Sequence, residues 1–159
     1  MEVKTMNKIT SFCIDHDKLG KGLYVSRIDG DVITYDMRMV IPNAGTYLDN
    51  AGLHTFEHLL ATYVRNSDQS DQIIYVGPMG CRTGFYFLTR DRMSKEEVIK
   101  LLQEAMAFIK DFHDDIPGAS ESKECGNYLD HDLAQARVYA KDYGEVIQQW
   151  TPTDMVYPE

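Results

Sequence analysis

The stretch that most constrains this chain runs from His54 to His58 and reads His-Thr-Phe-Glu-His. It lies in an apolar segment that predicts a helix over residues 51–65. Side chains four residues apart lie on one face of a helix, so both imidazoles can reach one metal ion, with Glu57 beside them. The order His-x-x-Glu-His is that of inverzincin metallopeptidases, in which the carboxylate activates a metal-bound water. Two helix histidines without a metal are the simpler alternative.

A catalytic metal site usually combines three protein ligands with one open position, so a third ligand is expected elsewhere in the chain. The inverzincin interpretation requires a downstream glutamate, and Glu96, Glu97 and Glu104 are the candidates. Cys125 is the other candidate, because a thiolate is a strong ligand for zinc and ferrous iron. The spacing alone favours Cys125 as a ligand no more than as a buried thiol.

Two further cysteines and one arginine could also carry chemistry. Cys81 lies between glycines at the start of a predicted strand, where Arg82 could favour the thiolate that a base or nucleophile needs. A turn cysteine with a packing role is the alternative. Cys13 alternates with apolar neighbours and is predicted to lie in the core. Arg38 interrupts an apolar strand, either on a solvated face or as a substrate contact.

The remaining pattern predicts an α+β fold, in which an antiparallel β-sheet packs against α-helices. Five segments have the composition or alternation of strands: 9–14, 23–28, 32–41, 73–76 and 83–90. Three helices are expected, over residues 51–65, 94–111 and 130–149. Ser94 and Glu97 form a capping box, and the other two helices have Asp49 or Asn50, and Asp130, as predicted N-caps.

The chain of 159 residues suits a single domain over 1–159, with an irregular tail over about 150–159. Its formal net charge of −9 disfavours nucleic acid and anionic membranes as partners, which leaves small molecules and other proteins. No apolar run approaches the length of about 20 residues that spans a bilayer. The N-terminus lacks the layout of a secretory signal, so a cytoplasmic location is expected. Three widely spaced cysteines do not predict a disulfide framework.

Several separated segments occur together in one order along residues 10 to 148. They are His-Thr-Phe-Glu-His-Leu-Leu from His54, Pro-Met-Gly-Cys-Arg-Thr-Gly-Phe-Tyr from Pro78, Cys-Gly-Asn-Tyr from Cys125, Ser-Phe followed by Asp-His from Ser11, Tyr-Asp-Met-Arg from Tyr35, and Ile-Pro-Gly-Ala from Ile116. Each segment alone is weak evidence, but the ordered set is specific. The set resembles the S-ribosylhomocysteine lyase family, LuxS.

The resemblance implies an α+β homodimer with two sites at the subunit interface. It implies the following residue roles: metal ligands His54, His58 and Cys125; acid–base residues Cys81 and Glu57; and substrate contacts Ser11, His16 and Arg38. It also implies one divalent metal per subunit, with Fe²⁺ as the native ion and Zn²⁺ or Co²⁺ as substitutes. One departure is Tyr75, which stands where the family has an aspartate associated with the amino-acid end of the substrate.

The activity implied by the resemblance is a carbon–sulfur lyase reaction of the activated methyl cycle. The thioether of S-ribosylhomocysteine is cleaved to homocysteine and 4,5-dihydroxy-2,3-pentanedione, the precursor of the quorum-sensing signal autoinducer-2, by carbonyl migration and β-elimination. Two alternatives remain open. An inverzincin-like metallopeptidase would use a glutamate ligand and give Cys81 no role, whereas a metal-binding module without activity is favoured by Tyr75 alone.

Overall fold

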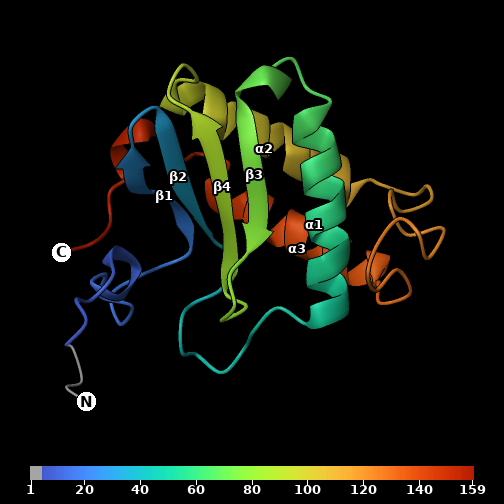
Figure 1. Cartoon of the computed structure of the whole chain (residues 1–159), viewed down its shortest axis with the longest axis horizontal. Helices are drawn as coiled ribbons and strands as arrows, with labels where there is room; N and C mark the ends of the chain where they lie inside the picture. Colours follow the sequence, from blue (N-terminus) through green and yellow to red (C-terminus); the bar gives the residue numbers. More distant parts are fainter. Residues whose placement is uncertain (1–4) are drawn as a thin grey trace.

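The computed structural model describes residues 5–159, which form an antiparallel four-stranded sheet and three α-helices (Figure 1). The strands are β1 (Gly22–Asp29), β2 (Val32–Arg38), β3 (Ile73–Pro78) and β4 (Gly84–Arg90), in the order β1-β2-β4-β3. The helices are α1 (Asn50–Arg65), α2 (Lys95–Lys110) and α3 (Leu133–Ile147). The predicted α+β class with an antiparallel sheet is therefore confirmed.

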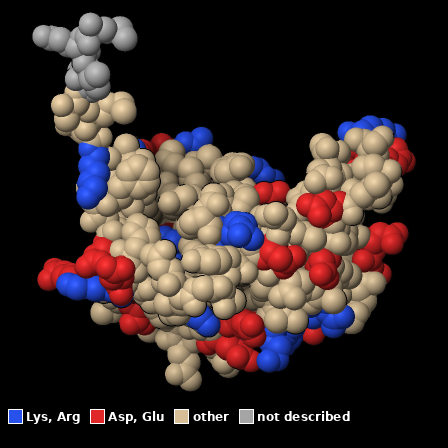
Figure 2. All heavy atoms as spheres, turned by 90° about the horizontal axis from the view of Figure 1, so that it is seen from below, with Lys and Arg blue, Asp and Glu red and all other residues tan. Residues whose placement is uncertain are grey.

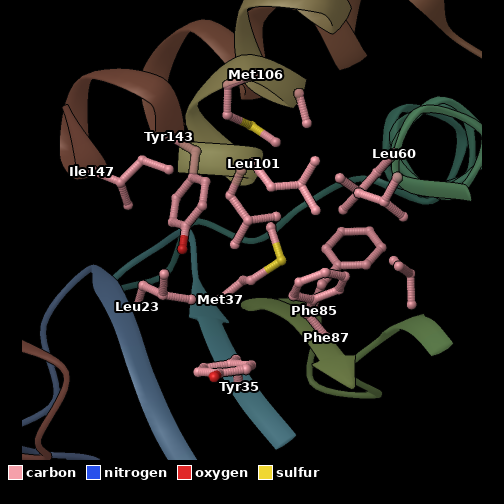
Figure 3. Close-up of a cluster of buried hydrophobic side chains, with 14 of the residues drawn as sticks. Leu23, Tyr35, Met37, Leu60, Phe85, Phe87, Leu101, Met106, Tyr143 and Ile147 are labelled. Carbon is pink, nitrogen blue, oxygen red and sulfur yellow. The ribbon is translucent and has the colours of Figure 1, made fainter. Parts of the chain in front are cut away.

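The core lies between the sheet and the helices. Alternation along β2 turns Tyr35 and Met37 to the helical side, and Phe85 and Phe87 of β4 join them there, all fully buried (Figure 3). In Figure 1, α2 and α3 lie behind the sheet and α1 stands beside β3. Within the described chain, no helix covers the opposite face of the sheet, and the C-terminal tail covers part of it through Tyr157 at Asp36.

Local capping signals set the helix ends. Asp49 accepts a hydrogen bond from the Gly52 amide and caps α1, and Ser94 and Glu97 form the predicted capping box of α2. The prediction that Asp130 caps the last helix is wrong, because Asp132 is the N-cap of α3. The reason is that the Asp130 carbonyl accepts a hydrogen bond from a site histidine, and the helix begins after that contact.

The strand predicted over residues 9–14 is also wrong, because this segment forms a short 3₁₀ turn, Thr10–Phe12, and pairs with no described strand. Ile9 and Phe12 are exposed in this chain. Without a sheet neighbour the segment buries little surface, and Cys13, which was predicted to lie in the core, is exposed as well.

The tail over residues 150–159 is irregular, as predicted, apart from one 3₁₀ turn, Pro152–Asp154. It is nevertheless attached firmly to the edge strand β1. The Trp150 indole donates to the Leu23 carbonyl at 2.8 Å, and the Val25 amide donates to the Met155 carbonyl at 2.9 Å. No helix in the described part of the chain is both long and apolar enough to cross a membrane.

Candidate metal centre and thiol pocket

His54, Glu57 and His58 lie on the partly exposed side of helix α1, because the other side of the helix packs in the core. Phe56 and Leu60 are fully buried, whereas the two histidines and the glutamate are only half-buried. The helical spacing therefore places both imidazoles on one accessible side, as the sequence predicted.

The loop after α2 brings Cys125 to the two histidines. Its Sγ lies 3.4 Å from Nε2 of His54 and 3.8 Å from Nε2 of His58, and the three atoms lie within 4.8 Å of one another. Bonds of about 2.3 Å to sulfur and about 2.05 Å to nitrogen, at a tetrahedral angle of about 109°, place such ligand atoms roughly 3.5 Å apart. The observed spacing fits one metal ion held by these three residues.

Backbone carbonyls orient both imidazoles. His54 donates through Nδ1 to the Asp130 carbonyl at 2.8 Å, and His58 donates through Nδ1 to the Pro117 carbonyl at 2.7 Å. A carbonyl oxygen can only accept, so each proton lies on Nδ1 and each Nε2 lone pair is free to bind a metal. Two neutral imidazoles and one soft sulfur form a donor set suited to zinc or ferrous iron.

The glutamates required by a peptidase interpretation are elsewhere. Glu97 is committed to the capping box of α2, and Glu96 and Glu104 are exposed on that helix. Among the described residues, none of the three belongs to a cluster that could hold a metal. The candidate third ligand is therefore Cys125.

His131, which no sequence motif identified, also lies against this centre. Its ring stacks on His54 with centroids 4.1 Å apart, and Nδ1 lies 2.9 Å from Oγ1 of Thr55. Burial, reinforced by the neighbouring His54 and His58, lowers the pKa of His131 and favours its neutral form. The signal that could have found it is its position six residues after Cys125, just before the cap of α3.

Glu57 and His58 line a hollow that also includes Tyr75 of β3, and we call it the metal-side hollow. The Tyr75 side chain is 54% exposed and lies over Gly77, where a Cβ would meet a ring carbon at 2.3 Å. The Tyr75 ring is thus accommodated by a glycine two residues later on the same strand.

A second hollow, of about 350 Å³, contains the other predicted site residues. Ser11, His16, Arg38 and Cys81 all line it, and we call it the thiol pocket. The Cys81 Sγ lies 3.1 Å from Oγ1 of Thr83, and Arg38 donates to the same oxygen at 2.7 Å. The structure thus brings together the residues that sequence reasoning associated with substrate.

Arg38 is not on a solvated face, because its side chain is only 3% exposed. It pairs with the equally buried Asp36 at 2.6 Å. Burial opposes the charged form of Arg38, but Asp36 outweighs it and raises the pKa of the guanidinium. Arg82, which was predicted to favour the thiolate, instead donates to the Leu48 carbonyl at 3.1 Å. The buried cation connected to Cys81 is therefore Arg38.

The metal-side hollow and the thiol pocket share no lining residue. In Figure 2, uncharged side chains make up most of the surface in view, with basic and acidic side chains scattered among them. One copy of the chain therefore presents Glu57 and His58 in one depression, and Ser11, His16, Arg38 and Cys81 in another.

Comparison with known proteins gives a consistent result. Residues 9–154 match the family model described as S-Ribosylhomocysteinase (LuxS). An S-ribosylhomocysteine lyase of Phocaeicola vulgatus is 45% identical, with 96% of this chain and 98% of the relative covered. Relatives of the same name from Finegoldia magna and Porphyromonas gingivalis are 42% and 44% identical, with 97% of this chain and 100% of each relative covered. The chain therefore belongs to the S-ribosylhomocysteinase (LuxS) family.

Proposed function

We propose that this chain is a metal-dependent carbon–sulfur lyase that cleaves S-ribosylhomocysteine to homocysteine and 4,5-dihydroxy-2,3-pentanedione, the autoinducer-2 precursor. The observation that carries the proposal is the convergence of His54, His58 and Cys125 beside Glu57, in a chain 45% identical to a lyase of that name. No observation favours a peptidase, since the candidate third ligand is a cysteine.

The reaction needs a carbonyl group in the right place. A thioether carbon releases thiolate by β-elimination when a carbonyl lies two carbons away, so the carbonyl must move from the first sugar carbon to the second and then to the third. Each move takes a proton from a carbon beside the carbonyl and returns it to the neighbouring carbon. Reduction at one carbon balances oxidation at the next, so no external redox partner is required.

Cys81 is the proposed carbon base, because its sulfur is exposed and is linked through Thr83 to the Arg38 cation, whose charge favours a thiolate. Glu57 is the proposed shuttle that moves protons between sugar oxygens and assists the final elimination. Its half-buried carboxylate lines the hollow beside His58. We propose Ser11 and His16 as substrate contacts, since both line the thiol pocket.

His54, His58 and Cys125 would hold one divalent ion per subunit, and we propose Fe²⁺ as the native ion, with Zn²⁺ or Co²⁺ as substitutes. The bound ion would supply Lewis acidity that makes protons beside a sugar carbonyl easier to remove. The three ligands leave room for a fourth position, as catalytic sites require.

We also propose that the chain works as a homodimer with its sites at the subunit interface. The sheet face that no described helix covers supports this arrangement, as does the division of the site residues between two depressions. A second copy would bring the metal side of one subunit to the thiol pocket of the other. The net charge of −9 supports a small-molecule substrate rather than nucleic acid or membrane partners. The cytoplasmic location stays a prediction.

The test is release of free thiol from S-ribosylhomocysteine by metal-loaded protein, followed together with metal content. Cys81→Ser should abolish release and keep the metal, whereas Cys125→Ala should lose the metal. A one-to-one mixture of the two variants, refolded together, should recover about a quarter of the activity if each site uses two subunits. Absence of thiol release from the metal-loaded wild type would reject the proposed function.

A further inference from the structure

The irregular C-terminal tail reaches the thiol pocket through a chain of polar contacts, of which the middle two are buried. The Tyr157 hydroxyl donates to Oδ2 of Asp36 at 2.7 Å, and Arg38 donates to the same oxygen at 2.6 Å. Arg38 then donates to Oγ1 of Thr83 at 2.7 Å, and that oxygen lies 3.1 Å from Sγ of Cys81. A residue near the end of the chain is therefore four contacts from the proposed base.

The residues in the middle of this chain of contacts are buried and have few hydrogen-bond partners. Asp36, Arg38 and Thr83 are 0%, 2% and 3% exposed. Oδ1 of Asp36 and Nε of Arg38 have no hydrogen-bond partner among the described residues. A buried charge with so few partners depends strongly on each one that it has. Tyr157 supplies one of the two contacts to Asp36.

The tail holds Tyr157 in place through its own packing. The Tyr157 ring stacks on Tyr24 of β1 with centroids 5.1 Å apart and an interplanar angle of 24°. Strand register sets Tyr24 directly opposite Asp36, so the stacked ring brings its hydroxyl over the carboxylate. Trp150 also packs against Tyr24, with the two rings perpendicular and their centroids 5.8 Å apart. The hydrogen bond from Tyr157 to Asp36 is therefore supported by a packed cluster of three aromatic rings.

We propose that Tyr157 is a positioning residue for the lyase reaction, which acts through Asp36 and Arg38 to hold positive charge beside the Cys81 thiolate. A hydrogen bond to a carboxylate spreads its negative charge. When Tyr157 donates to Asp36, the carboxylate cancels less of the Arg38 charge, and more of that charge is felt at the thiol pocket. This inference rests on the proposed function, in which Cys81 is the base.

Loss of the Tyr157 hydroxyl should therefore make the thiolate less favourable while leaving the metal side unchanged. The other titratable groups that line the pocket, His16, Tyr47 and Tyr86, are the same in wild type and variant. Their contributions to a pH profile cancel in the comparison. A difference between the two profiles can then be assigned to the Asp36–Arg38 pair.

The experiment uses metal-loaded full-length protein and the variant Tyr157→Phe, which keeps the stacked ring. Iodoacetamide alkylation of Cys81 is followed across a pH series by peptide mass spectrometry, which separates it from the exposed Cys13. The variant should be alkylated about threefold more slowly near pH 7, with the profile displaced to higher pH. The kcat should fall by a similar factor, with KM and metal content unchanged. The melting temperature should fall by a few degrees, because the buried Asp36 carboxylate loses one of its two hydrogen bonds.

Tyr24→Phe is the matched control, because it removes a hydroxyl from the same stack that donates to the Gly20 carbonyl instead of Asp36. Its alkylation profile should match the wild type. An unchanged profile in Tyr157→Phe, or an equal displacement in Tyr24→Phe, would overturn the inference. Alkylation does not require turnover, so a displaced profile in protein that releases no thiol from S-ribosylhomocysteine would reject the function and retain the Tyr157 contact.

Discussion

Replacing Gly118 by alanine should weaken metal binding without unfolding the protein. Gly118 has a φ of +74°, in the left-handed region that favours glycine. A Cβ at this position would lie 3.1 Å from Nδ1 and 3.2 Å from Cε1 of His58. Because the same Nδ1 donates to the Pro117 carbonyl at 2.7 Å, the ring cannot move away without disturbing that hydrogen bond.

The two effects of the substitution have different sizes and different readouts. Left-handed backbone costs an alanine about 1 to 2 kcal/mol, which lowers the free energy of unfolding. Disturbing a group that orients a metal ligand costs roughly 10- to 100-fold in metal affinity. For Gly118→Ala we therefore expect both losses, with the loss of affinity caused by displacement of His58 Nε2 from the position facing Cys125.

Two other glycines separate these effects. Gly45 has a φ of +87° and no atom within 4 Å of an added Cβ, so Gly45→Ala should lose stability and keep metal affinity. Gly126 lies beside Cys125, but an added Cβ there would have no atom within 4 Å and its φ is not positive. Gly126→Ala should therefore keep both the stability and the metal affinity. Zn²⁺ competition against a chromophoric chelator measures affinity, and thermal unfolding of metal-free protein measures stability. If Gly118→Ala binds Zn²⁺ as tightly as Gly126→Ala, the role assigned to Gly118 is wrong.

Two further predictions concern Tyr75 and Asp49. Gly77→Ala should raise the KM for S-ribosylhomocysteine by displacing the Tyr75 ring. In a Tyr75→Ala background the same substitution should raise the KM no further, and additive effects in steady-state kinetics would contradict this. Tyr139→Phe should cost metal-free protein about 1 kcal/mol near neutral pH, because its hydroxyl donates to Asp49. Partial burial opposes ionisation of Asp49, but hydrogen bonds, that from Tyr139 foremost, outweigh it and lower its pKa below 3.8. This stabilisation is present above the pKa of Asp49 in the unfolded chain and is lost as the pH falls through its pKa in the folded protein. The difference in free energy of unfolding between wild type and variant, measured with urea, should therefore shrink in acid. A difference that stays constant with pH would refute the prediction.

The helices could be predicted from the sequence because their determinants are local. The spacing of apolar residues predicted α1 over 51–65, and the structure has Asn50–Arg65. The capping box of Ser94 and Glu97 acts within one turn and was predicted correctly. The start of α3 could not be predicted to the residue, because the choice between Asp130 and Asp132 depends on a contact with His54, which is 76 residues away.

The N-terminal segment could not be predicted because a strand is defined by its partner. The alternation over residues 9–14 is compatible with a strand, yet the described sheet offers this segment no neighbour. Exposure of Ile9, Phe12 and Cys13 follows from that missing partner. In the proposed homodimer these apolar side chains would be available to the second subunit, since Phe12 also lines the thiol pocket.

The environment of the proposed base shows why the site could be predicted only in part. Alternation along β2 places Asp36 and Arg38 on the face opposite Tyr35 and Met37. A charged pair on an uncovered sheet face would normally be solvated, which was the simpler interpretation. It fails because Tyr157, 121 residues beyond Asp36, contacts the pair from the tail. Residue types and strand periodicity could identify the groups that carry the chemistry, whereas the burial that controls their charge depends on a segment whose sequence has no periodicity at all.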